Sequence, residues 1–330
     1  MTYALLKDPN HTRVSYQSSN TLAINELTLT VAFAENIRLL QIGGVTYIAF
    51  DSTQPITQIE CRQLSRLSFV YAIFECHGDM LKPVALTAQY MIDSELSGIL
   101  KYTGKTNALF TRLMLNIASL YVKNAPQQLN VLDPLAGKGT SLYEALMQGH
   151  HAYGVEIDGK VAHESVVYLK KYLETAKYKH ETHAERTSGQ SQFGKFTAQR
   201  NQIKIKTPAP CHFEMVAGDA RNTGDYFKKN FFHIIVADLP YGVQHGSKAN
   251  KAAATSRNAF GLIADAMPGW VRVLKPGGAI VLAWNLFLIP RHEMERLLAQ
   301  NGFAVQDLGM DFAHKVDQAI DRDFIVGVLK

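Results

Sequence analysis

The residues best suited to chemistry stand after an apolar segment, where 233–237 is followed by Asp238, Leu239, Pro240 and Tyr241. The segment predicts a strand that ends in two acceptors, the Asp238 carboxylate and the Leu239 carbonyl, held by the restricted backbone before Pro240. Tyr241 offers a flat face on which a base can stack. Two acceptors on the N–H groups of an exocyclic base amine would direct the nitrogen lone pair at an electrophilic methyl group. The pattern therefore predicts methylation of a base amine.

A glycine-rich turn follows an earlier apolar strand and reads Asp133-Pro134-Leu135-Ala136-Gly137-Lys138-Gly139-Thr140. Gly137 and Gly139 allow a tight bend and a close approach to a ligand. Leu142 occupies the place of the third small residue of a dinucleotide fingerprint, and Leu132 occupies the place of the first glycine of a phosphate-binding loop. Asp133 would repel a diphosphate but suits a cationic sulfonium. The turn therefore favours S-adenosylmethionine as the cofactor.

Acids also stand at the ends of the next two predicted strands. Glu156, 19 residues after Gly137, is placed to accept hydrogen bonds from both ribose hydroxyls, and Ile157 can cover the adenine ring. Asp219, followed by Ala220, is placed to accept the adenine amino group. Any one of these acids could instead cap a helix. Their occurrence in chain order at successive strand ends favours a nucleoside site.

Taken together, these segments resemble the class I S-adenosylmethionine-dependent amino-methyltransferases, over about residues 90–330. More narrowly, the turn at 133–140, the motif at 238–242 and the stretch Lys101–Asn107 are similar to RNA methylases related to the THUMP-containing tRNA guanosine methyltransferases. The resemblance implies methyl transfer to the 2-amino group of a guanosine in tRNA, with Asp238 to Tyr241 as the catalytic motif. It places the cofactor at Thr106, Asp133, Pro134, Ala136, Gly137, Gly139, Glu156, Ile157, Asp219, Ala220 and Asp238.

Other functions remain open at this point. The acid-x-Pro-aromatic motif also serves adenine amines, so an adenine amino-methyltransferase acting on rRNA or DNA is an alternative. A non-catalytic RNA-binding protein that keeps a methyltransferase fold is a second one. Leu142 disfavours a nicotinamide-dependent oxidoreductase. RNA, with tRNA first, is the expected partner.

Alternating strands and helices must position these residues. Beyond residue 101, strands are predicted near 129–133, 152–156, 213–217, 233–237, 279–284, 303–309 and 323–329. Helices are predicted near 106–122, 140–148, 159–174, 258–273 and 291–301. Such alternation predicts an α/β domain over 101–330, a Rossmann-like, mostly parallel, doubly wound sheet of seven strands. The last two strands are expected to be antiparallel to the others.

The first 80 residues predict a separate α+β domain. Strands near 3–6, 37–42, 45–50 and 69–75, with helices near 20–33 and 55–67, give the order β-α-β-β-α-β of ferredoxin-like domains. The turn Gly43-Gly44 marks a hairpin. Residues 81–100 are expected to be a connector.

Charge is concentrated in one segment. The net charge is +5, yet residues 169–206 alone contain nine basic and three acidic residues. This segment overlaps a predicted insertion at about 176–210, which lacks apolar periodicity and is expected to be functional or mobile. We expect it to contact phosphate groups of a polyanion, together with Lys248, Lys251 and Arg257.

Composition excludes several other classes. An apolar content of 47% and a charged content of 19% describe a globular chain with no segment long enough for a membrane helix. The N-terminus lacks a secretion signal, and the three cysteines form no CxxC pair, so a reducing cytoplasm is expected and a metal site is not.

Overall fold

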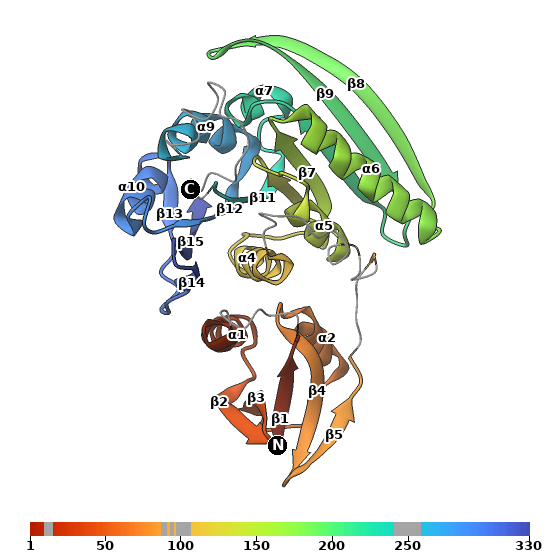
Figure 1. The fold of residues 1–330 in the computed structure, drawn as a ribbon, viewed down its shortest axis with the longest axis vertical. Helices are drawn as coiled ribbons and strands as arrows, with labels where there is room; N and C mark the ends of the chain where they lie inside the picture. Colours follow the sequence, from red (N-terminus) through yellow and green to blue (C-terminus); the bar gives the residue numbers. More distant parts are fainter. Residues whose placement is uncertain (10–15, 87–90, 93–95, 97–106, 241–258) are drawn as a thin grey trace.

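The computed structural model describes residues 1–9, 16–86, 91–92, 96, 107–240 and 259–330. Figure 1 shows a small sheet made by the N-terminal residues and a larger sheet made by the rest of the chain. Helices of the small part lie between the two sheets, against a helix of the large part.

The N-terminal sheet has the order β2-β3-β1-β4-β5, with every neighbouring pair antiparallel. Its strands are β1 (Thr2–Lys7), β2 (Glu35–Ile42), β3 (Val45–Asp51), β4 (Val70–His77) and β5 (Met80–Val84). Helices α1 (Tyr16–Thr30) and α2 (Gln58–Arg66) pack on the face from which Leu5, Phe50 and Ile73 project. The predicted order β-α-β-β-α-β is present with β5 in addition, and the ferredoxin-like description stays a prediction.

Two local details differ from the sequence-based boundaries. Helix α2 begins after Thr57 rather than at Pro55, because Thr57 and Glu60 form a reciprocal capping box. The connector expected at 81–100 is wrong at its start, since β5 occupies 80–84. The chain reverses into β5 at Gly78, whose φ of 61° suits a tight hairpin turn.

The larger sheet has ten strands in the described part of the chain, so the predicted count of seven is wrong. The order is β13-β15-β12-β11-β6-β7-β10-β9-β8, and β14 pairs with β15. The strands are β6 (Asn130–Asp133), β7 (His151–Glu156), β8 (His180–Ser191), β9 (Gly194–Ile205), β10 (Cys211–Ala217), β11 (Phe232–Asp238), β12 (Leu274–Asn285), β13 (Phe303–Val305), β14 (His314–Asp317) and β15 (Ile320–Leu329). All seven predicted strands are among them, and β8, β9 and β14 are the additions.

Strand direction is mostly parallel. The pairs β12–β11, β11–β6, β6–β7 and β7–β10 are parallel, whereas β15 is antiparallel to both β12 and β13. The expectation that both final strands oppose the others is therefore wrong for β13, which runs with the parallel set. The carboxyl ends of β6, β7, β10 and β11 consequently meet along one edge of the sheet.

The predicted insertion at 176–210 is a regular element. Strands β8 and β9 form a long hairpin that turns at Gln192–Phe193 and curves beyond the sheet, in green in Figure 1. Residues 199–205 of β9 pair with β10, so the hairpin extends the sheet at its edge. The sequence lacks the usual alternation because almost all of β8 is exposed.

Helices cover both faces of the sheet. One face carries α4 (Ala108–Leu120), α5 (Thr140–Met147) and α6 (Gly159–Thr175), and the other carries α7 (Thr223–Tyr226), α9 (Ala259–Val273) and α10 (Arg291–Gln300). In β6, Val131 belongs to the first core and Leu132 to the second. This two-sided packing is the doubly wound arrangement that the sequence predicted.

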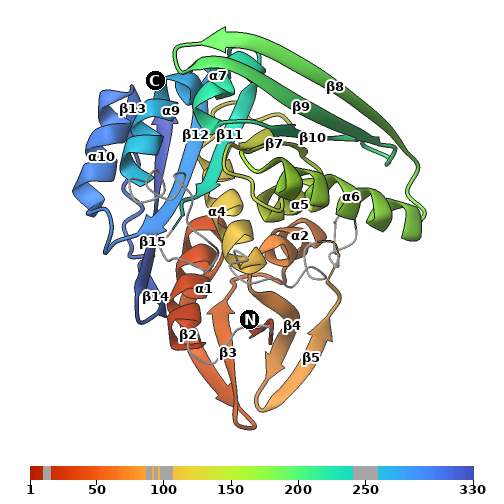
Figure 2. The ribbon, with the colours of Figure 1, turned by 45° about the horizontal axis from the view of Figure 1, so that its top comes forward.

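The two sheets are joined through α1, α2 and α4, which lie near one another in Figures 1 and 2. Asn116 of α4 donates through Nδ2 to Glu26 Oε1 in α1 at 2.7 Å and to the Arg66 carbonyl in α2 at 2.8 Å. Glu26 is fully buried and also accepts hydrogen bonds from Ser68. One side chain thereby links three helices.

Candidate functional site

A cavity of about 290 Å³ opens at the carboxyl ends of the parallel strands. It is lined by Pro134, Leu135, Val155, Glu156, Ile157, Asp219, Ala220, Asp238, Pro240 and Leu262. Three carboxylates, from the ends of β7, β10 and β11, therefore face one space. Their common charge suits a ligand that carries cationic or hydrogen-bond donor groups.

The glycine turn supports this cavity from behind. Gly137 and Gly139 have φ values of 51° and 89°, which disfavour any side chain. A Cβ at Gly139 would also lie 2.7 Å from Ser165 Oγ of α6. Gly137 donates its N–H to Glu156 Oε2 at 2.9 Å. Its glycines thus fix the acid of the next strand, while Pro134 and Leu135 of the same turn line the cavity.

Glu156 is held by main-chain groups on both sides. Its Oε1 accepts from Asp158 N at 2.8 Å, in addition to the bond from Gly137. Burial raises the pKa of Glu156, and the two backbone N–H groups partly oppose that effect. Ile157, next in the chain, is 74% exposed and lines the cavity mouth. This position agrees with a covering role over a planar ligand.

Asp133 does not face the ligand space as predicted. Its side chain is buried, and its oxygens accept hydrogen bonds from Leu135 N and the Ser141 hydroxyl. Burial, together with the negative charges of Asp238 and Glu156, raises its pKa to about 7. The residue folds back because its own turn and the first helical turn of α5 supply donors within reach. Its role here is to shape the turn.

Asp219 is tied to an arginine. Arg221 donates from Nε and Nη2 to both carboxylate oxygens of Asp219, the shortest contact being 2.6 Å. Burial tends to raise the pKa of Asp219, but these bonds and the charge of Arg221 outweigh it and lower the pKa. With Arg221 N also donating to Oδ1, each carboxylate oxygen of Asp219 accepts two hydrogen bonds, so a ligand amine would share an oxygen with Arg221.

The backbone at Asp219 has a second support. Asp219 N donates to Tyr226 Oη at 3.1 Å, and a Cβ at Gly218 would lie only 2.5 Å from that oxygen. The ring of Phe196, from β9, packs edge-on against Tyr226 at 5.3 Å between centroids. The ring centroid of Phe193, in the hairpin turn, lies 4.8 Å from the guanidinium carbon of Arg221. The hairpin therefore contacts both groups that hold Asp219.

The acid-x-Pro segment leaves the sheet at the end of β11, which lies between β12 and β6. Leu239 is buried and donates its N–H to the Ala283 carbonyl of β12 at 2.8 Å, which anchors the turn. Asp238 and Pro240 flank it and line the cavity. Tyr241 lies outside the described residues, as do Thr106, Lys248, Lys251 and Arg257.

Six of the predicted cofactor residues line this cavity together with Pro240. These six are Pro134, Glu156, Ile157, Asp219, Ala220 and Asp238. Asp133, Ala136, Gly137 and Gly139 are not among the lining residues. The sequence analysis missed Leu135, Val155 and Leu262. The first two lie within the predicted turn and strand, whereas Leu262 comes from α9, and only the contact between helix and strand end could reveal it.

Within the described ranges, no group of three or more His, Cys, Asp or Glu side chains is arranged to hold a metal ion. None of the helices described is long and apolar enough to cross a membrane.

No protein-family model matches the chain, and no curated protein matches it in sequence. Solved structures resemble it weakly. A TehB-like SAM-dependent methyltransferase from Corynebacterium glutamicum is 13% identical, with a TM-score of 0.36 over 64% of this chain and 86% of that one. A candidate RNA methyltransferase from Pyrococcus horikoshii is 16% identical, with a TM-score of 0.40 over 71% and 94%. A ribosomal protein L11 methylase from Lactobacillus delbrueckii is 13% identical, with a TM-score of 0.38 over 66% and 80%.

Proposed function

We propose that this chain is an S-adenosylmethionine-dependent methyltransferase that modifies the exocyclic 2-amino group of a guanosine in tRNA. The observation that carries the proposal is the convergence of Glu156, Asp219 and the Asp238–Pro240 turn on one cavity. The residues proposed to hold the nucleoside and the turn proposed to hold the amine thus line the same cavity.

The cavity residues fit the groups of the proposed cofactor. The Glu156 carboxylate suits the two ribose hydroxyls, Ile157 suits the adenine ring, and Asp219 suits the adenine amino group. The negative charge of Asp238 suits the sulfonium. When bound, S-adenosylmethionine supplies a methyl group activated by a positively charged sulfur.

The chain's own residues would prepare the acceptor. Asp238 and the Leu239 carbonyl would hold the two N–H groups of the base amine, as the motif predicts. The anchoring of Leu239 on β12 keeps these acceptors in a fixed direction. Asp238 would also accept a hydrogen bond from the nitrogen as its proton becomes acidic. A strong general base is therefore not required.

Positive charge near the site favours RNA as the partner. Of the nine basic residues in 169–206, Lys170, Arg200 and Lys206 are in ion pairs with Glu174, Glu214 and Glu181. Lys171, Lys177, Lys179, Arg186, Lys195 and Lys204 form no ion pair with any described residue. They lie along α6 and the β8–β9 hairpin, where they can contact a phosphate backbone.

Methyl transfer can be measured directly. The protein should move label from S-adenosylmethionine into total tRNA, and nucleoside analysis should identify N2-methylguanosine. Asp238→Ala should reduce the rate at least about 100-fold even at saturating S-adenosylmethionine. Asp225→Ala, which removes an exposed acid of α7, is the matched control and should keep the rate.

The outcomes are distinct. Label found on adenine, or in rRNA or DNA only, would contradict guanosine in tRNA as the substrate while keeping amine methylation. Absence of transfer to any nucleic acid, or full activity of Asp238→Ala, would overturn the proposal.

A further inference from the structure

A second, larger cavity lies at the opposite ends of the sheet strands from the carboxylates. It measures about 400 Å³ and is walled by α2, α4, the loop before β6 and the segment between α5 and β7. Leu129 and His150, which directly precede β6 and β7, belong to its wall. It therefore opens at the amino ends of the strands, whereas the first cavity opens at their carboxyl ends.

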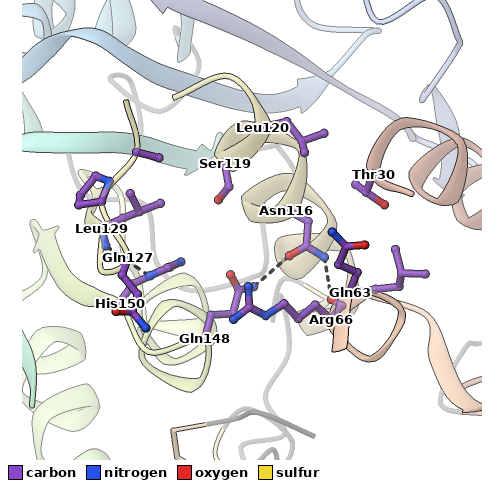
Figure 3. Close-up of a pocket in the computed structure, with 13 residues that line it drawn as sticks. Thr30, Gln63, Arg66, Asn116, Ser119, Leu120, Gln127, Leu129, Gln148 and His150 are labelled. Carbon is purple, nitrogen blue, oxygen red and sulfur yellow. Dashed lines mark hydrogen bonds between the residues drawn. The ribbon is translucent and has the colours of Figure 1, made fainter. Parts of the chain in front are cut away.

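The polar groups of this cavity are donors and amides. No carboxylate is among its lining residues, which include Arg66, Gln63, Gln127, Asn116 and Gln148. Within the described part of the chain, the guanidinium of Arg66 and the amides of Gln63 and Gln127 make no hydrogen bond or ion pair. Figure 3 shows Arg66 extending along the cavity toward Gln148. An anionic ligand would find a cation with no competing acid.

His150 adds an uncharged donor. Its Nδ1 accepts a hydrogen bond from Leu129 N at 3.3 Å, so the neutral ring carries its proton on Nε2. Burial, and then the positive charge of Arg66, lowers the pKa of His150 to about 4. At neutral pH the ring is therefore a fixed neutral group beside the arginine.

The cavity is built on a fixed framework. Asn116 bonds both Glu26 and the Arg66 carbonyl, and its Oδ1 accepts from Gln148 Nε2 at 3.3 Å. These bonds, drawn in part in Figure 3, hold α2 against α4. Glu26, which accepts the hydrogen bond from Asn116, is buried, and this burial raises its pKa. The wall is thus formed before any ligand arrives, as in most small-molecule sites.

Apolar side chains complete the lining. Leu120 and Pro126 expose apolar surface that a ring can contact, and Leu67 and Leu129 are buried in the wall. The Gln63 and Gln127 amides can each donate and accept at the edge of the ring. A ligand for this cavity should carry an anion for Arg66, a planar ring for the apolar side chains, and hydrogen-bond donors and acceptors for the glutamine amides. This combination describes a nucleotide.

We infer that the cavity between α2, α4 and the 125–129 loop binds a nucleotide, with its phosphate at Arg66 and its base between the apolar side chains and the glutamine amides. The inference does not depend on the proposed methyl transfer. The nucleotide is either free or part of an RNA chain, and both sources share this chemistry.

Calorimetric titration with the four nucleoside 5′-monophosphates and the four nucleosides tests the site. We expect at least one monophosphate to bind, and the matching nucleoside to bind about tenfold or more weakly. Arg66→Ala should remove this preference. Arg62→Ala, an exposed arginine on the same helix that does not line the cavity, should keep it.

A second variant controls for misfolding. Ser119→Trp fills the cavity from α4 without removing Arg66, and both variants are compared with the wild type by thermal melting. If monophosphates do not bind, the same variants are tested against tRNA. Loss of tRNA affinity in both variants, at an unchanged melting temperature, would assign the site to a nucleotide within RNA. If both variants bind the monophosphates and tRNA as tightly as the wild type does, the inference is wrong.

Discussion

At the scale of single residues, the four acids around the candidate active site are held in four different ways. Asp133 is buried against its own turn, Glu156 is fixed by two backbone N–H groups, and Asp219 is paired with Arg221. Asp238 lines the cavity at the end of β11. The differences mean that these acids cannot be exchanged for one another, and each has its own expected response to pH and mutation.

Asp133 should affect stability in a pH-dependent way. Its pKa is about 7 in the folded protein, compared with about 4 in an unfolded chain. The stability that its protonated form contributes is complete below pH 4 and is lost as the pH rises through 7. Asp133→Asn should therefore raise the free energy of unfolding by about 1–2 kcal/mol at pH 8 and by much less at pH 5.

Denaturant unfolding at the two pH values measures this difference. Asp225→Asn, at an exposed acid, should show no such dependence. An equal effect of Asp133→Asn at pH 5 and pH 8 would contradict the buried, protonated state.

The positions of these acids were predictable from the sequence, but the direction of each side chain was not. Spacing places Glu156, Asp219 and Asp238 at the ends of strands that a parallel sheet must bring together. The orientation of Asp133 depends on the hydroxyl of Ser141, eight residues later. No sequence pattern marks Ser141 as the partner of Asp133. Leu262 is likewise brought to the site by packing of α9, an element that the sequence shows only separately, whereas Arg221 lies two residues after Asp219 and pairs with it locally.

At the scale of elements, the β8–β9 hairpin is the largest difference from the sequence-based expectation. Its polar, charged strands give no alternating signal because β8 is the sheet edge and is exposed on both faces. The seven strands and five helices that were predicted beyond residue 101 have clear apolar periodicity, and all of them are present. Regular burial, and not strand formation as such, is what the pattern detects.

The distal half of the hairpin should influence cofactor binding. It can be removed by deleting Ser188–Thr197 and joining Thr187 to Ala198 with an Asn-Gly turn. This keeps the pairing of 199–205 with β10 but removes Phe193 and Phe196, which contact Arg221 and Tyr226. We expect S-adenosylmethionine to bind about fivefold or more weakly, since Asp219 loses support from both sides.

Calorimetry of the shortened protein makes the comparison. Lys195→Ala removes a charge from the same part of the hairpin, without either aromatic ring, and should leave cofactor affinity as it was. Unchanged affinity in the shortened protein would separate the hairpin from the cofactor site.

At the scale of the whole molecule, Asn116 is one of the polar side chains that connect the two sheets in the described part of the chain. The buried acid Glu26 depends on Asn116 and Ser68 for its hydrogen bonds. Such a contact between regions 90 residues apart in sequence leaves no local pattern, so it could not be foreseen from spacing.

Asn116→Ala should lower the free energy of unfolding by about 2 kcal/mol, because a buried carboxyl group and a backbone carbonyl lose a donor. Gln127→Ala, in the wall of the same cavity, makes no bond with a described residue and should change stability little. Denaturant titration of the two variants compares them. Equal stability of both would show that the contact between the sheets does not contribute.

Binding of S-adenosylmethionine is the most direct test of the account. Calorimetry should show that the wild-type protein binds it in preference to NAD. Glu156→Gln should weaken that binding about 10- to 100-fold, because its charged hydrogen bonds to the ribose are lost. Glu174→Gln, on the exposed side of α6, should bind as the wild type does. Failure of the wild type to bind S-adenosylmethionine, or equal affinity in Glu156→Gln, would contradict the carboxylate-lined cavity as the cofactor site.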